Sequence, residues 1–332
     1  MTSESKWKEM LDEFRAFGGT AENVRLGYGA LGRGLFPIDP AKSVDICIPE
    51  SLLVPLDDVI FDNDVFRVRD DSLVSERGRA FVERYEHDFA WGTEARAEIE
   101  RVLTTMHTLP EKLRNILEKG HLSRFLQPLT AELVQKAFLA TRAISSGGRT
   151  VVMPIIELAN HGGSATYGGE RDVSLRDKFE GEVLVQYSFP ADPYDIFLNW
   201  FFVSQEPCAF SMPMTYSKGG TEFRIGREYE KEQRPWVPKI SVIGNTISLD
   251  YLLLGHRSFP RVPRGAFHKA MANAGLEPED EVFEQIQHAN RQTFLDLIGE
   301  LEGIDSPAVP LLRTMARYQL NALSSHFGIR QV

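Results

Sequence analysis

The sequence predicts an α+β fold in which short strands form small sheets, a helical insertion interrupts them, and an all-α lobe follows. Residues 23–54 and 150–208 are short β-like pieces separated by Gly and Pro. Residues 72–144 and the chain from Ser248 onward carry apolar side chains at helical spacing instead. Because the chain has 332 residues and 42% hydrophobic content, we expect it to divide into two or three units with sizeable cores.

The first predicted element is an amphipathic helix over residues 4–16. Its apolar side chains recur at helical spacing, at Trp7, Met10, Leu11 and Phe14. Gly18 and Gly19 follow directly and end the helix.

Two domains are expected, a core domain over residues 1–208 and a mainly helical C-terminal domain over residues 209–332. Within the core domain, a helical insertion covers about residues 55–145. Its apolar positions include Phe81, Tyr85, Phe89, Ile99, Leu103, Met106, Leu133, Ala137 and Phe138. The C-terminal helical pattern includes Val282, Ile286, Phe294, Leu297 and Leu301.

The glycine-rich segment at residues 27–32 has the pattern G-x-G-x-x-G of dinucleotide-binding loops. Such a loop opens a helix, but here Gly34, Pro37 and Pro40 follow and prevent one. No acidic residue closes a βαβ unit at the expected place. The sequence therefore disfavours a nicotinamide site, and a glycine-rich β-turn is the simpler interpretation.

Composition limits the classes of partner and site. The net charge of −10 disfavours nucleic-acid binding, which needs Lys and Arg at phosphates, and favours basic partners. With only Cys47 and Cys208, and with scattered histidines, we expect neither disulfides nor a metal site. No apolar run of membrane-spanning length and no secretory signal pattern is present, so we expect no membrane association and a cytoplasmic location. The sequence does not indicate the oligomeric state.

Three motifs occur in order along the chain, Gly32-Arg-Gly-Leu-Phe36, Met153-Pro-Ile-Ile-Glu-Leu-Ala-Asn-His161 and Gly181-Glu-Val-Leu-Val-Gln-Tyr187. Together they resemble the SET-domain methyltransferases. The insertion and the C-terminal lobe are similar in order to the subgroup of the plant Rubisco large-subunit lysine methyltransferase, and this resemblance implies that residues 209–332 bind substrate or a partner. The resemblance implies a SET-type fold of small sheets with a knot-like crossing, a pseudoknot, and S-adenosyl-L-methionine as cofactor.

The same resemblance implies a cofactor site formed by Gly32, Arg33, Gly34, Arg142, Asn160, His161 and Tyr187. The glycines leave the backbone around residues 31–35 bare against the methionine part of the cofactor. Arg142 would pair with the cofactor carboxylate, for which a guanidinium is well suited. The pair Asn160-His161 would hold the amino end and the adenine. A turn cap for Asn160-His161 and a simple ion pair for Arg142 are the alternatives.

Tyr187 is the predicted catalytic residue. Methyl transfer from a sulfonium is an in-line displacement that mainly requires alignment of a neutral nucleophile, and a phenol beside the methyl group can fix that alignment. Deprotonating a lysine acceptor costs about 4.6 kcal/mol at pH 7, which burial and the neighbouring sulfonium reduce. A tyrosine that is merely buried in the core is the alternative.

Two positions depart from the family pattern. Trp200 and Phe201 stand where Tyr and Gly are usual, so Trp200 and Phe202 are expected to line an altered substrate channel, or else to be core aromatics. Glu157 replaces the usual Asp before Asn-His. The resemblance thus implies a protein N-methyltransferase acting on a lysine of a protein or peptide substrate. Two alternatives stay open, a SET-like binding protein without catalysis and a methyltransferase acting on histidine, a peptide or a small amine.

Overall fold

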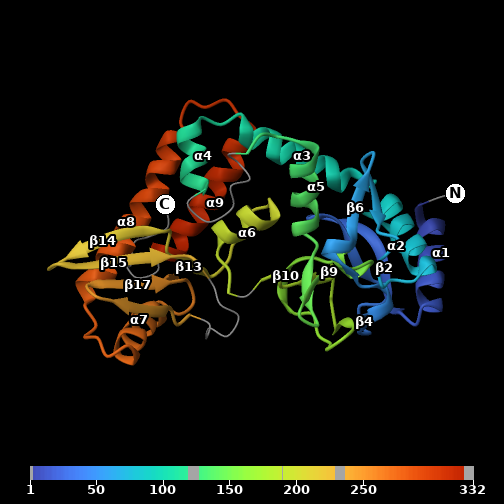
Figure 1. Ribbon diagram of the computed structural model, residues 1–332, viewed down its shortest axis with the longest axis horizontal. Coiled ribbons are helices and arrows are strands. Elements are labelled where there is room, and N and C mark those ends of the chain that lie inside the picture. Colours follow the sequence, from blue (N-terminus) through green and yellow to red (C-terminus); the bar gives the residue numbers. More distant parts are fainter. Residues whose placement is uncertain (1–2, 119–126, 189, 229–235, 325–332) are drawn as a thin grey trace. The chain divides into compact units, whose positions relative to one another are not determined.

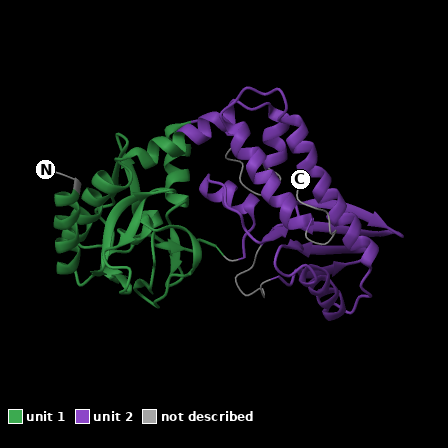
Figure 2. Ribbon diagram, turned by 180° about the vertical axis from the view of Figure 1, so that it is seen from behind, with its two compact units in different colours: residues 1–100, 130–188 green, residues 101–129, 189–332 purple. Residues whose placement is uncertain are grey.

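A computed structural model describes residues 3–118, 127–188, 190–228 and 236–324. The chain forms two compact units, and each is described by itself (Figure 2). Unit 1 consists of residues 1–100 and 130–188, and unit 2 of residues 101–129 and 189–332. The functional domains expected at 1–208 and 209–332 stay a prediction, because compact units need not coincide with functional domains.

Unit 1 is built from small sheets, as the sequence predicts (Figure 1). Its strands are β1 (Thr20–Glu22), β2 (Val24–Gly29), β3 (Gly32–Pro37), β4 (Val44–Ile48), β5 (Val54–Pro55), β6 (Val59–Asp62), β7 (Val65–Val68), β8 (Ile144–Ser146), β9 (Arg149–Val152), β10 (Asn160–Ala165), β11 (Val173–Asp177) and β12 (Leu184–Val185). They form two three-stranded sheets, β1-β4-β11 and β5-β9-β8, and three pairs, β2-β3, β6-β7 and β10-β12. The β10-β12 pair is parallel. Whether the chain forms the predicted pseudoknot stays a prediction.

Helix α1 (Ser3–Ala16) confirms the predicted N-terminal helix. Trp7, Met10, Leu11 and Phe14 are all buried, so its apolar stripe faces the core. Gly18 follows with a φ of 83°, the left-handed conformation that commonly terminates a helix.

The helices of the insertion begin at Glu76, close to the start of the helical spacing at residue 72. Strands β5 to β7 occupy residues 54–68, where β7 alternates exposed and buried side chains with the period of a strand. The helices are α2 (Glu76–Phe89), α3 (Glu94–His107), α4 (Glu111–Glu118) and α5 (Ala131–Ala140), and α3 runs from unit 1 into unit 2. Ser75 and Thr130 cap α2 and α5, each side chain accepting a backbone N–H at 3.1 Å. Residues 119–126 of the predicted insertion lie outside the described residues.

Unit 2 corrects the expectation of an all-α lobe. Its strands are β13 (Cys208–Phe210), β14 (Met214–Lys218), β15 (Thr221–Gly226), β16 (Lys239–Ile243), β17 (Thr246–Asp250) and β18 (Leu253–His256). They form the sheet β14-β15-β17-β16 and the pair β13-β18. Helices α6 (Pro193–Trp200), α7 (Val262–Asn273), α8 (Asp280–Glu300) and α9 (Ala308–Leu323) complete the unit. After the strands, the chain is helical from Val262 onward, as predicted. The prediction of helix before Val262 was wrong because a short apolar run such as 252–254 has no periodicity that separates strand from helix.

A buried ionic network holds unit 2 together. Arg227 donates to Asp192 at 2.6 Å and to Asp195 at 3.0 Å, and its side chain is almost fully buried. Gln319 of α9 donates to the other oxygen of Asp192 at 2.7 Å, which connects α9 to the start of α6. Removing the carboxylate of Asp192 would leave the buried charge of Arg227 without its main partner, which is strongly destabilising.

In the described part of the chain, the helices are too short or too polar to cross a bilayer.

Candidate functional site

The three sequence motifs meet in unit 1. The side-chain amide of Asn160 donates to the backbone carbonyl of Arg33 at 3.1 Å, and so joins β10 to β3. The backbone N–H of Val183 donates to the carbonyl of Leu35 at 2.8 Å, which brings the third motif to the same strand. Asn160 and His161 pair in parallel with Leu184 and Val185. Residues from positions far apart in the sequence therefore form one site.

The segment at 27–32 belongs to a hairpin, which confirms the turn interpretation. Strands β2 and β3 pair antiparallel, with Gly27 opposite Gly34 and Gly29 opposite Gly32. Gly32 has a φ of 91°, a conformation that glycine adopts without strain. A Cβ atom at Gly34 would collide with the side chains of Asn160 and Glu182. The glycines thus allow these two side chains to lie directly on the hairpin backbone.

Tyr187 follows β12 and packs beside His161, with ring centroids 5.2 Å apart. Its phenol donates to the carbonyl of Ala159 at 2.8 Å. Burial raises the pKa of Tyr187 well above its usual value, although the nearby Arg142 lowers it. Tyr187 is therefore a neutral phenol at physiological pH, with its proton directed at a fixed acceptor.

His161 is buried and holds the backbone that leads to Tyr187. Its Nδ1 accepts the backbone N–H of Tyr187 at 3.2 Å, so a neutral ring carries its proton on Nε2. The side chain of His161 is thus used inside the site. The contact that the resemblance implies for His161 is through its backbone, which this arrangement allows.

Arg142 lies in unit 1 and forms an internal ion pair. Its Nε is 3.4 Å from Glu157, whose side chain is only 1% exposed, and Tyr85 donates to the same carboxylate at 2.9 Å. The guanidinium also lies over the ring of Phe138, 3.9 Å from its centroid. Arg142 makes a further bond to Thr141 at 2.8 Å. Glu157, which stands where the resemblance would place Asp, is therefore able to form an ion pair with Arg142.

A second carboxyl group is buried beside this pair. Burial, and then the charge of Glu157, raise the pKa of Glu86 well above its usual range, whereas Arg142 lowers it. Burial also raises the pKa of Glu157, and Arg142 opposes that rise. Two carboxylates and one guanidinium would leave a net negative charge in a dry place, so we expect Glu86 to hold a proton.

The structure adds two residues that the sequence analysis did not assign. The first is Glu182, which accepts from the Asn160 amide at 2.5 Å. Its position inside the third motif is the feature of the sequence that could have indicated it. Tyr167 is half-buried and follows β10, where the carbonyl of Ala165 accepts from the N–H of Gln186 at 2.8 Å. That bond brings Tyr167 near Tyr187, and burial, then the charge of Tyr187, raise the pKa of Tyr167.

Trp200 and Phe202 lie in unit 2, so their predicted place in a channel beside Tyr187 stays a prediction. Both are half-buried rather than fully enclosed. Phe201 between them caps α6 with a φ of 64°. This is the left-handed conformation that favours glycine, the residue usual at this position of the family motif.

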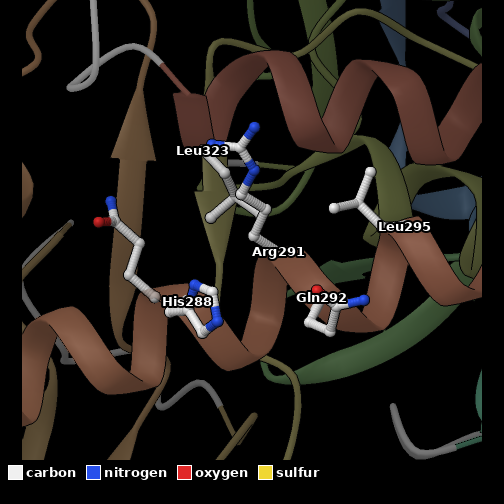
Figure 3. Close-up of a pocket in the computed structure, with 6 residues that line it drawn as sticks. His288, Arg291, Gln292, Leu295 and Leu323 are labelled. Carbon is white, nitrogen blue, oxygen red and sulfur yellow. The ribbon is translucent and has the colours of Figure 1, made fainter.

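Two hollows are lined by other residues. One, of about 210 Å³, lies in unit 2 against α8 and the end of α9 (Figure 3). It is lined by Gln287, His288, Arg291, Gln292, Leu295 and Leu323. The other, of about 200 Å³, lies in unit 1 beside Trp91 and Arg96. Neither contains a predicted site residue. Within the described residues, no group of three or more His, Cys, Asp or Glu side chains is placed to hold a metal ion.

Comparison with known proteins gives matches only at the level of structure. No family model matches the chain, and no curated protein matches its sequence. The class of solved structures to which it is similar is the SET-domain methyltransferases of the Rubisco large-subunit type. These are similarities at low identity, so the chemistry of the site rests on the contacts described above.

The particular structures cover nearly the whole chain. The SET domain of LSMT bound to lysine and AdoHcy is 15% identical with a TM-score of 0.44, covering 98% of this chain and 90% of that one. Rubisco LSMT bound to AdoMet is 15% identical with a TM-score of 0.44, covering 99% and 91%. Rubisco LSMT bound to sinefungin and monomethyllysine is 14% identical with a TM-score of 0.42, covering 98% and 90%.

Proposed function

We propose that this protein transfers a methyl group from S-adenosyl-L-methionine to a lysine side chain of a protein or peptide substrate. The observation that carries the proposal is the bond from the Asn160 amide to the Arg33 carbonyl. Through this bond the glycine hairpin lies beside the Asn-His pair. Val183 bonds to Leu35 of the same hairpin, and strand β12, which follows Val183, leads to Tyr187. The three motifs that resemble a SET domain thus share one site rather than three unrelated ones.

The residues present fit the cofactor. Gly32 exposes bare backbone on the hairpin, whereas Gly34 is covered by Asn160 and Glu182, and a side chain at Gly34 would displace them. Arg142 uses one nitrogen for Glu157 and one for Thr141, and a guanidinium has further N–H groups for a carboxylate. Arg33 would contribute its backbone, because its side chain donates to the carbonyl of Phe89 at 2.6 Å. When bound, the cofactor supplies an electrophilic methyl group on a sulfonium.

Tyr187 would orient the acceptor amine. Its proton is directed at the Ala159 carbonyl, and a phenol oxygen can also accept an amine N–H through a lone pair. With that N–H fixed, the nitrogen lone pair points along the line of attack. A carbon–nitrogen bond forms, the carbon–sulfur bond breaks, its electron pair stays on sulfur, and the amine proton goes to solvent.

Because its pKa is raised, Tyr187 is a poor candidate for the step that removes the amine proton. A lysine acceptor must therefore arrive neutral, at a cost of about 4.6 kcal/mol at pH 7 before burial lowers it. Tyr167 offers a second phenol close to Tyr187, which would help hold the neutral amine. The net charge of −10 supports a basic substrate by long-range attraction.

One observation favours a second candidate, a binding protein without catalysis. Trp200 and Phe201 replace the usual Tyr-Gly, and Phe201 takes the left-handed conformation without being glycine. A channel closed by these aromatic side chains would still allow a partner to bind.

A methyl-transfer assay with labelled donor on a panel of basic proteins and peptides separates the candidates. The proposal predicts label on lysine, with mass increments of about 14 Da per methyl group, and loss of label with Tyr187→Phe. Label on histidine or on a small amine would change the acceptor class. Partner capture without any label in wild-type protein would favour the binding protein.

A further inference from the structure

Glu182 carries a charge in a half-buried place. It precedes β12, in contact with the glycine hairpin β2-β3. One carboxylate oxygen, Oε1, accepts from the Asn160 amide at 2.5 Å. Among the described residues, no Lys, Arg or His forms an ion pair with it. Its hydrogen bond to the neutral Asn160 amide therefore leaves the negative charge without a cationic partner among the described residues.

The hairpin is shaped around this carboxylate. A Cβ atom at Gly34 would collide with Oε1, and one at Gly29 would lie 2.7 Å from Oε2. Both oxygens therefore lie across the hairpin, over positions that are glycine. Two glycines on opposite strands make room for a negatively charged group, not only for a turn.

Asn160 presents a second acceptor at the same place. Its amide nitrogen makes two hydrogen bonds, to Arg33 and Glu182, and this fixes which end of the side chain is nitrogen. Neither bond uses the amide oxygen, Oδ1. A carboxylate and an amide oxygen at one position recognise a group that only donates, and an ammonium group does so best.

We propose that Glu182 is the countercharge for the α-ammonium group of the methionine part of S-adenosyl-L-methionine, and that it selects ligands which carry this group. The inference rests on the proposed function, since it assigns a recognition residue to the same cofactor site. It adds a specific charge that the motif resemblance does not provide.

The test is calorimetric titration of Glu182→Gln with two ligands. Glutamine keeps the shape and can accept from the Asn160 amide, but it removes the charge. S-adenosylhomocysteine, which carries the ammonium group, should bind about tenfold more weakly or worse, as expected for loss of a charge-assisted hydrogen bond. 5′-Methylthioadenosine, which lacks the amino-acid part, should bind within about twofold of wild type.

Glu180→Gln is the matched control. Glu180 lies two residues away in the same turn and is exposed, so its removal changes the net charge equally without touching the hairpin. It should leave both affinities unchanged. Glu182→Asp keeps the charge on a shorter side chain and should bind S-adenosylhomocysteine better than Glu182→Gln does. This second variant decides the question if the first does not fold.

Three results would count against the inference. Equal binding of S-adenosylhomocysteine by wild type and Glu182→Gln would show that Glu182 makes no contact with the ammonium group. Tighter binding by the variant would mean that the carboxylate occupies the ligand's place. An equal loss for both ligands would indicate a general defect. If the wild-type protein binds neither ligand, the proposed function itself fails, and that outcome is separate from these three.

Discussion

The phenol of Tyr187 donates its proton to the backbone carbonyl of Ala159 at 2.8 Å, one residue before Asn160. The bond connects Tyr187, which is expected to align the acceptor, to the start of strand β10, where the side-chain amide of Asn160 lies. Because burial raises the pKa of Tyr187, this proton stays in place at neutral pH. In the proposed reaction, Tyr187 would therefore orient a nitrogen rather than deprotonate it.

Tyr187→Phe should lower the turnover number by about 100-fold or more, because the acceptor loses its fixed hydrogen bond. Affinity for S-adenosylhomocysteine should change by only a few-fold. Steady-state methyl transfer and calorimetry measure the two effects separately. Tyr216→Phe in unit 2 is a suitable control, and normal turnover in Tyr187→Phe would contradict the assignment.

Tyr167→Phe should reduce methyl transfer by about tenfold, or change the number of methyl groups added, since Tyr167 follows Ala165, whose carbonyl accepts from the N–H of Gln186 next to Tyr187. Cofactor affinity should not change. Mass spectrometry of the methylated substrate over time would show the product distribution. Identical rates and products in the variant would mean that Tyr167 only packs beside Tyr187.

Gly34→Ala should weaken binding of S-adenosylhomocysteine by about tenfold or more, because a Cβ atom there displaces Asn160 and Glu182. Gly181→Ala is the matched control, since a Cβ atom at Gly181 meets nothing within 4 Å. Calorimetry with thermal unfolding of both variants separates a local effect from a loss of fold. Unchanged affinity in Gly34→Ala would show that the ligand does not use this hairpin.

Asp195→Asn should change how the stability of the protein depends on pH. Burial raises the pKa of Asp195 to about 6, although Arg227 lowers it, and Asp192 raises it further. The phenol of Tyr251 lies 2.6 Å from Asp195 and 3.1 Å from the carbonyl of Pro190, and one phenol proton cannot serve both. A protonated Asp195 donates to Tyr251, which then donates to Pro190, so both contacts are satisfied.

The sign follows from the raised pKa. The folded state keeps the Asp195 proton between about pH 4 and pH 6 while the unfolded state loses it, so this group's contribution to stability falls as pH rises through that range. Above about pH 6 the contribution is lost and the curve is level. The aromatic and guanidinium neighbours, Tyr251 and Arg227, do not titrate there.

The neutral amide introduced by Asp195→Asn keeps the protonated geometry, so the variant should gain stability relative to wild type as pH rises from about 4 to about 6, by about 3 kcal/mol at most. Urea unfolding of both proteins at several pH values measures the difference. Asp305→Asn, at an exposed aspartate of the same unit, should show no such trend. A difference that does not depend on pH would mean that Asp195 is ionised throughout.

The sequence predicts the local parts of the fold well where a pattern is long and periodic. Helix α1 is an example, because its apolar residues repeat over about two turns and glycines end it. The strands at 208–256 are not separable from helix by pattern alone, because short apolar runs such as 252–254 fit either structure. Propensity over so few residues is overridden by pairing with distant strands, such as that of β13 with β18.

The site follows the same division. Gly34, Asn160 and Tyr187 lie in quoted motifs and are brought into one unit, whereas the role of Glu182 depends on a crossing between residues 34 and 182 that no local pattern contains. Likewise, the sequence shows that Arg142 and Glu157 are charged, but it does not show that they form a buried ion pair. Burial is a property of the packed structure, and it determines whether a charge is a surface feature or part of a site.

The central claim is that Asn160 and the glycine hairpin form a cofactor site. Calorimetric titration of wild type, Asn160→Ala and the exposed-site control Asn273→Ala with S-adenosylhomocysteine tests it most directly. We predict micromolar binding by wild type and by the control, and loss of binding in Asn160→Ala. Absence of binding by the wild-type protein, or unchanged binding by Asn160→Ala, would contradict it.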